Sequence, residues 1–302
     1  MFKDYFKLIG SLFCTLTLFL ILPSCSPDYP KVPPISVSPT SEYHPGKFVW
    51  YDLMTTDVTA AKKFYGELFG WKFDDSGNAD ASYTVIKHNG KNIGGIFALD
   101  KTKSKGANSQ WISFLSIENM EGVIEYIKIH DGKIYTEPFD LPDRGTVAVV
   151  IDPQNAVFAL VHSSSGDSKD AEPVYNEWLW TELWTNNVDA SLNFYKNMIG
   201  YQNKVFMTQA QTKYYVLRNE DKPRAGVVKI MLEGVNPHWM PYIAVEDPSK
   251  IIDRVEELGG KIILGREGIA GHSAAIIADP TGAVFTINVW PLDRNAFKEI
   301  EK

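Results

Sequence analysis

The chain has 302 residues, with 30 Lys plus Arg against 37 Asp plus Glu, so its formal net charge is −7. This length predicts about two domains, and the acidic balance without a dense basic run argues against a nucleic-acid partner. The two cysteines, Cys14 and Cys25, lie near the N-terminus, which excludes a disulfide framework, a zinc-binding cysteine cluster and a cysteine nucleophile from the rest of the chain.

Residues 1–24 are typical of a bacterial signal peptide. Lys3 and Lys7 precede an apolar run, Leu8 to Leu22, that is shorter than the ~20 residues of a membrane span. The run ends in Leu-Pro-Ser followed by Cys25, which resembles a bacterial lipobox. We therefore expect cleavage before Cys25 and lipidation of its thiol, with an ordinary cleaved signal or an uncleaved anchor as the alternatives.

The residues after Cys25 predict the membrane in which the lipid-anchored protein is located. Ser26, rather than Asp, follows the cysteine, and by resemblance to Gram-negative lipoproteins this favours the outer membrane of the cell envelope. Its partner there is the membrane, reached through the lipid anchor. Residues 25–45 are rich in proline and serine, so we expect an extended tether rather than a packed element.

The body of the chain is a duplication. Residues 48–71 align with residues 178–201 at an offset of 130, with eight identities that include the Phe-Tyr pair of both segments. Asp152-Pro153 aligns with Asp279-Pro280 at an offset of 127, so only small loop insertions separate the copies. We predict a first domain over 46–163 and a second over 177–292, able to fold separately, with a linker at 164–176 and a tail at 293–302.

Each copy consists of two similar half-units. In the first copy Phe48–Met54 is predicted to be a strand, and apolar residues at helical spacing predict a helix over Val58–Phe69 that ends at Gly70. The same order recurs, with the helix Met120–Ile129 and the strands Tyr83–Ile86, Ile93–Leu99, Trp111–Ile117, Thr146–Ile151 and Val157–Val161.

This order resembles the vicinal oxygen chelate (VOC) superfamily, which contains glyoxalase I, fosfomycin and bleomycin resistance proteins and extradiol dioxygenases. The matching motifs are a V-x-x-A-x-x-F-Y helix and a D-P-x-G/N-A-x-F hairpin. Each occurs twice, with Ser191 in place of the helix alanine in the second copy. The resemblance implies an α+β fold of two tandem VOC-type domains, each a pair of βαβββ modules that form a cupped mixed sheet.

VOC enzymes usually hold a divalent metal in the cup. The resemblance places the ligand positions on side chains that do not bind hard divalent cations, and the histidines lack metal-binding spacing. We therefore expect no metal and no other cofactor. The positions are Trp50, Ile112, Ala159 and a residue within 96–99 in the first copy, and Trp180, Met240, Thr286 and a residue within 227–230 in the second.

Strand alternation predicts what fills the cups instead. Asp52 and Glu182 are the inward carboxylates, and they are candidate general bases in a metal-independent lyase or isomerase. Aromatic and polar residues around them suit a small planar or amphipathic organic ligand, although the indoles can equally be core residues that fill a vacated metal site. The candidate ligand-binding residues are Trp50, Met54, Phe114, Trp180, Trp184, Tyr242, Thr286 and Asn288.

Three functions therefore remain open from the sequence. The first is metal-free binding of a small organic molecule, the second is the metal-independent enzyme, and the third is a non-catalytic interaction role with both cups filled. The fold alone does not decide among them, because it supports many chemistries. The oligomeric state is also open.

Overall fold

The computed structural model describes residues 31–76, 83–99, 108–208, 211–265, 273–290 and 297–299. The predicted signal peptide, the lipidation site Cys25 and the start of the tether lie outside these residues. Within the described ranges, no helix is long and apolar enough to cross a membrane.

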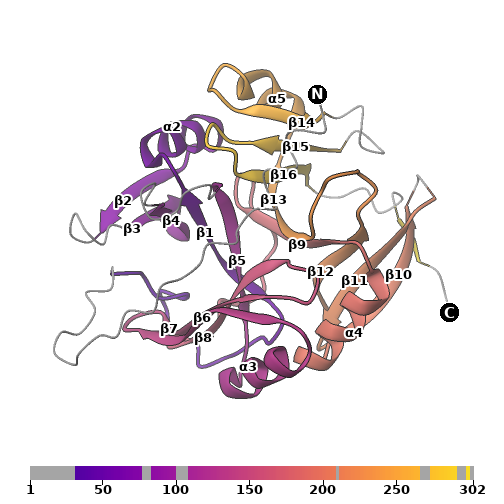
Figure 1. The fold of residues 1–302 in the computed structure, drawn as a ribbon. Coiled ribbons are helices and arrows are strands. Elements are labelled where there is room, and N and C mark those ends of the chain that lie inside the picture. Colours follow the sequence, from indigo (N-terminus) through magenta and orange to yellow (C-terminus); the bar gives the residue numbers. More distant parts are fainter. Residues whose placement is uncertain are drawn as a thin grey trace.

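The body contains four βαβββ modules in sequence, as predicted (Figure 1). The first domain comprises β1 (Phe48–Thr55), α2 (Val58–Phe69), β2 (Lys72–Ser76), β3 (Tyr83–His88), β4 (Lys91–Ala98), β5 (Gln110–Ser116), α3 (Met120–Ile129), β6 (Lys133–Leu141), β7 (Gly145–Ile151) and β8 (Val157–Ser163). The second comprises β9 (Trp178–Thr185), α4 (Val188–Ile199), β10 (Gln202–Thr208), β11 (Lys213–Asn219), β12 (Lys222–Lys229), β13 (His238–Val245), α5 (Pro248–Val255), β14 (Lys261–Leu264), β15 (Ala274–Ala278), β16 (Val284–Val289) and β17 (Phe297–Glu299).

Each domain forms its own mixed sheet. The first has the order β2-β3-β4-β1-β5-β8-β7-β6, and the second has the order β14-β15-β16-β13-β9-β12-β11-β10-β17. The first strands of the two modules pair antiparallel at the centre, and each also pairs in parallel with the last strand of its own module. Because β17 pairs with β10, part of the predicted tail is an edge strand of the second sheet.

The helices begin and end at residues repeated in both copies. Asp57 and Asn187 cap α2 and α4 by accepting hydrogen bonds from the third residue of the following turn. Gly70 and Gly200 end the same helices with φ of 71° and 77°, a left-handed conformation that costs glycine little. The duplicated sequence signals therefore specify helix length as expected.

The two halves share one hydrophobic core, which argues against the expectation that they fold separately. The helical faces of the two sheets are turned toward each other, with α2 beside α5 and α3 beside α4 (Figure 1). Two reciprocal hydrogen bonds join the halves, from the Tyr65 hydroxyl to Asp279 (3.2 Å) and from the Tyr195 hydroxyl to Asp152 (3.0 Å). The Phe-Tyr and Asp-Pro motifs of the repeat thus contact each other across the domain boundary.

The tether prediction is wrong for its C-terminal part, because residues 32–45 pack on the first domain. Val32 and Ile35 are 4% and 5% exposed, and Tyr43 stacks on the ring of His162. Thr40 donates its amide hydrogen to the carbonyl of Ser165 (2.9 Å). The proline content predicts an extended backbone. It does not predict whether apolar side chains such as Val32 pack against another part of the protein.

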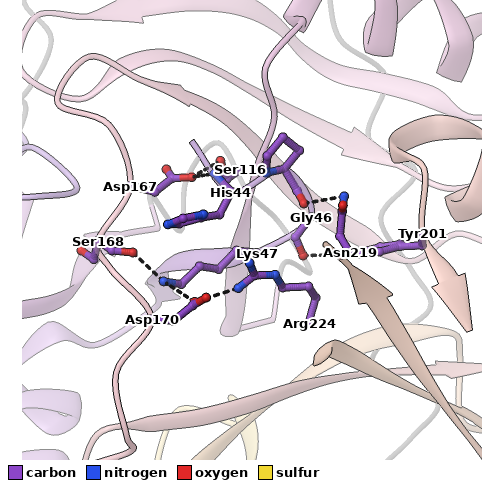
Figure 2. A network of polar contacts seen from close by, with 11 residues as sticks. His44, Gly46, Lys47, Ser116, Asp167, Ser168, Asp170, Tyr201, Asn219 and Arg224 are labelled. Carbon is purple, nitrogen blue, oxygen red and sulfur yellow. Dashed lines mark hydrogen bonds and ion pairs between the residues drawn. The ribbon is translucent and has the colours of Figure 1, made fainter. Parts of the chain in front are cut away.

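The predicted linker is also packed, and it joins the N-terminal segment to both domains (Figure 2). The Asp167 carboxylate accepts hydrogen bonds from the His44 amide (2.7 Å) and the Ser116 hydroxyl (2.5 Å). Asp170 pairs with Lys47 (3.0 Å) and with Arg224 of the second domain (2.7 Å). Burial of Asp170 opposes its ionisation, but these two cations outweigh burial and lower its pKa to about 2.

Candidate functional site

The candidate sites lie on the sheet faces opposite the helices. We call these faces cup 1, in the first domain, and cup 2, in the second. Alternation along β1 sends Tyr51 and Leu53 to the shared core and Trp50 to cup 1, where it lies in register with Phe114. In cup 2, Tyr242 lies in register with Trp180 on one side and with Thr286 on the other.

All the predicted residues lie on these two faces. In cup 1, Phe114 is also in register with Ala159, and Met54 packs against the same apolar cluster. In cup 2, Trp184 and Tyr242 pack against a separate apolar cluster, and Asn288 follows Thr286 by two residues on β16. Since the helical faces meet in the core, the cups face away from each other, so Asp52 and Glu182 cannot act together on one small substrate.

The carboxyl group of cup 1 is held by aromatic donors. Asp52 Oδ1 accepts hydrogen bonds from Trp50 Nε1 (2.8 Å) and from the Tyr83 hydroxyl (2.7 Å). The indole also donates to the Tyr83 oxygen (3.1 Å), so the three side chains form one cluster. Arg144 completes it, with its guanidinium carbon 4.1 Å from the centroid of the Trp50 ring.

Cup 2 repeats the cluster at equivalent positions. Trp180 Nε1 donates to the Tyr214 hydroxyl (2.8 Å), and Tyr214 in turn hydrogen-bonds with Glu182. Glu182 Oε1 also accepts from Trp184 Nε1 (2.9 Å) and from the Tyr242 hydroxyl (2.8 Å). We refer to the arrangement shared by both cups, Trp50-Tyr83-Asp52 and Trp180-Tyr214-Glu182, as the Trp-Tyr-carboxyl cluster.

A glycine makes room for each cluster. Gly95 lies in register with Asp52, and a Cβ there would be 1.8 Å from the Tyr83 hydroxyl oxygen. Gly226 lies in register with Glu182, and its Cβ would be 2.1 Å from the Tyr214 hydroxyl oxygen. Both distances are far inside van der Waals contact, so the tyrosine occupies the space of the missing side chain.

Burial sets the electrostatics of both carboxyl groups. It raises the pKa of Asp52, although the positive charge of Arg144 and the hydrogen bonds from Tyr83 and Trp50 act to lower it. Burial also raises the pKa of Glu182, although hydrogen bonds from Tyr242, Tyr214 and Trp184 lower it. Burial thus favours the protonated form of Glu182, which can donate a hydrogen bond to a ligand oxygen.

The two cups differ in polarity and exposure. Phe114, Ala159 and Val161 of cup 1 are replaced in cup 2 by Tyr242, Thr286 and Asn288. Trp50 and Phe114 are 2% and 8% exposed, whereas their counterparts Trp180 and Tyr242 are partly exposed. Asn288 Oδ1 is buried and has no hydrogen-bond partner among the described residues, a condition that costs about 1–3 kcal/mol unless a partner is supplied.

The residues at the family's metal positions do not fit a metal. In cup 1 these positions carry the Trp50 indole, which is already hydrogen-bonded to Asp52, the alkyl group of Ile112 and the methyl group of Ala159. In cup 2 the Thr286 hydroxyl is the one oxygen among them that could bind a metal. Within the described ranges, no group of three or more His, Cys, Asp or Glu side chains could hold a metal ion.

Sequence reasoning missed three participants. Tyr83 and Tyr214 open the segments Tyr-Thr-Val and Tyr-Tyr-Val, which match at an offset of 131, so extending the repeat comparison into β3 and β11 would have found them. Arg144 lies in the β6–β7 turn, where neither periodicity nor motif marks an inward side chain. Its burial to 1% exposure emerges only from the folded structure.

Comparisons with known proteins agree with this architecture. The family model "Bleomycin resistance protein-like N-terminal" matches residues 47–87. "Putative glyoxylase CFP32" of Mycobacterium bovis is 28% identical over 250 residues, which cover 82% of this chain and 96% of that protein. "Anthracycline biosynthesis protein DnrV" of Streptomyces peucetius is 26% identical over 260 residues, covering 82% and 94%.

Solved structures share the fold. The Mn(II)-bound glyoxalase from Novosphingobium aromaticivorans superposes with a TM-score of 0.54 at 14% identity, over 85% of this chain and 84% of that chain. BphC, a halotolerant catechol dioxygenase, gives a TM-score of 0.53 at 10% identity, over 85% and 89%. The chain has the VOC fold.

The shared fold contrasts with the residues of the site. The glyoxalase from Novosphingobium aromaticivorans binds manganese, whereas the described part of this chain contains no group of three or more His, Cys, Asp or Glu side chains that could hold a metal ion. In place of such donors, both of its domains carry the Trp-Tyr-carboxyl cluster. The fold is thus that of a metalloenzyme superfamily, but the side chains inside the cups build a different kind of site.

Proposed function

We propose that this VOC protein binds a small planar organic molecule in cup 2 without a metal, as a lipid-anchored protein of the cell envelope. The observation that carries the proposal is the polarity of cup 2. Tyr242, Thr286 and Asn288 stand where cup 1 has apolar side chains, and the Asn288 oxygen lacks a partner among the described residues. A ligand that donates a hydrogen bond would satisfy it.

The aromatic side chains of cup 2 favour a flat ligand. Trp180, Trp184 and Tyr242 are partly exposed on one face of the sheet, so their rings can offer apolar surface to a stacked molecule. Glu182 lies between the two tryptophans and, when protonated, can donate to a carbonyl oxygen. Two relatives are named for anthracycline biosynthesis, which makes an anthracycline a reasonable first probe.

Replacing Tyr242, Thr286 and Asn288 of cup 2 by their cup 1 counterparts should weaken this binding. In the chain from residue 26 onward, Tyr242→Phe, Thr286→Ala and Asn288→Val together remove hydrogen-bonding groups worth about 0.5–1.5 kcal/mol each, so the anthracycline Kd should rise at least tenfold. Isothermal titration calorimetry measures the change. The fold should persist, because the first domain already tolerates Phe114, Ala159 and Val161 in the same register.

Two controls make the experiment decisive. Tyr135→Phe makes the same chemical change at a residue of the first domain that is 62% exposed and outside cup 2, so it should leave the Kd unchanged. Dialysis against EDTA should also leave the Kd unchanged. An unaltered affinity in the triple variant would disprove binding in cup 2, and a need for added metal would disprove the metal-free mode.

The anchoring part of the proposal has its own test. Cys25→Ala should abolish the incorporation of labelled palmitate and move the protein from the membrane fraction to the soluble fraction, because a diacylated cysteine provides stable anchoring. The membrane and soluble fractions are compared by immunoblotting. Full retention of the variant in the membrane fraction would instead indicate that Leu8 to Leu22 remains as an uncleaved anchor.

A further inference from the structure

The segment before β1 fills cup 1. Val32 and Ile35 belong to the apolar cluster of this cup, together with Trp50 and Phe114. They lie on the face of the sheet that the helices leave uncovered, which is where cup 2 presents its partly exposed tryptophans. Residues 32–36 thus occupy in the first domain the place that cup 2 leaves to a ligand, and we call them the plug.

The plug crosses cup 1 from one edge of the sheet to the other. Ser76 on the edge strand β2 donates to the carbonyl of Lys31 (2.7 Å), and Arg144, next to the opposite edge strand β6, donates through Nε to the carbonyl of Pro33 (2.7 Å). These carbonyls are two residues apart, a reach of roughly 7 Å. The sheet therefore curls until its two edges face each other across the plug.

The hydrogen bonds of the plug resemble those of a bound molecule rather than those of a strand. It forms no ladder with either edge, and Pro33 and Pro34 have no amide hydrogen to donate. Arg144 donates to the plug carbonyl from above the Trp50 ring, and Arg144 Nη2 has no partner among the described residues. A buried guanidinium with a free N–H is a ready site for an anion.

The attachment of the plug permits its release. On the N-terminal side it continues toward Cys25, and on the C-terminal side Val37 is 74% exposed. Beyond that residue the chain is fixed by the Asp167 and Asp170 contacts with His44 and Lys47 (Figure 2). Displacement of the plug would therefore leave the β1 end of the segment in place.

We propose that cup 1 is a binding site for an amphipathic anion and that the plug occupies this site when the anion is absent. The bound anion would place its acidic group on Arg144 and its apolar part on Trp50. This inference is independent of the proposed function, since it concerns the other cup. Binding of such an anion and seating of the plug exclude each other. The probe for the test is 8-anilinonaphthalene-1-sulfonate (ANS), which joins a sulfonate to an aromatic body.

The first experiment removes the plug by substitution in the chain from residue 26 onward. Val32→Asp with Ile35→Asp should expel the plug and create one additional ANS site by fluorescence titration. Adding Arg144→Gln should weaken that site at least tenfold. Val37→Asp makes the same change at an exposed neighbour and should behave as the wild type. An unchanged number of ANS sites in the folded double variant, or binding indifferent to Arg144, would overturn the proposal.

The second experiment needs no substitution, so it stands even if the double variant fails to fold. The amide hydrogen of Ser36 donates to Ser165 Oγ (3.0 Å) and should be protected from exchange. Saturating ANS should increase its exchange rate at least tenfold while the amides of β1 stay protected. Continued protection of Ser36 at saturating ANS would show that plug and anion do not compete, and the proposal would be wrong.

Discussion

Residues 177–302, expressed without the first domain, should show no cooperative unfolding transition. Phe285 of the second domain packs against Phe64, Tyr65 and Phe69 of the first, and Trp239 packs against Phe48. Exposing aromatic side chains costs about 1.5–3 kcal/mol each, and losing several of these contacts approaches the 5–15 kcal/mol that stabilises an ordinary domain.

Buried polar groups add to the loss. Without the first domain, Asp279 loses the Tyr65 hydroxyl, and the buried Tyr195 loses the Asp152 carboxylate. Urea unfolding followed by circular dichroism should give a broad, non-cooperative change for the isolated half. Mixing it with residues 26–176 should restore a sigmoidal transition, as the complementary face returns. A sharp transition of the isolated half, unaltered by the other fragment, would refute the shared core.

Gly95→Ala should be among the most destabilising single substitutions in the first domain. The new methyl group would meet the Tyr83 ring and hydroxyl at 1.8–2.5 Å, so Tyr83 must move and release Asp52. Overpacking costs about 1–3 kcal/mol and a buried carboxyl that loses a donor costs about 1–3 kcal/mol more, so we expect a loss of roughly 2–6 kcal/mol from urea unfolding.

Matched variants test the cause of this loss. Gly265→Ala, whose new methyl would lie 3.8 Å from its nearest neighbour, Ile262, should cost less than 1 kcal/mol, because that distance is ordinary contact. In a Tyr83→Val background, Gly95→Ala should become nearly neutral, since the clashing ring is gone. Gly226→Ala should reproduce the effect in the second domain through Tyr214. Additive costs of Gly95→Ala and Tyr83→Val would contradict the steric explanation.

The repeat made the fold predictable from the sequence. A duplication with four similar half-units specifies four βαβββ modules, and strict alternation on β1 and β9 placed Trp50, Asp52, Trp180 and Glu182 on the correct face. These are local properties, set by periods of two and of 3.6 residues. They hold without knowledge of tertiary contacts, because a one-residue slip would expose the entire core face.

Other features depend on contacts that no local pattern encodes. The plug was predicted to be a tether, since proline composition describes the backbone and not what Val32 and Ile35 cover. Separate folding of the halves was predicted because each half contains a complete pair of βαβββ modules. The shared core argues against it, because the apolar faces of the helices turn toward the other domain and not only toward their own sheet. Arg144 lies in a turn and reaches Trp50 only after the sheet has curled.

Because the two sheets are arranged back to back, cup 1 and cup 2 open on opposite sides of the molecule. Val32, at the start of the plug, is seven residues after Cys25, a reach of at most roughly 25 Å for extended chain. If Cys25 carries lipid, cup 1 must lie within that distance of the bilayer surface. Cup 2, on the opposite side of the shared core, then opens toward the aqueous compartment. A molecule arriving from water would meet cup 2, and one leaving the bilayer surface would meet the plug.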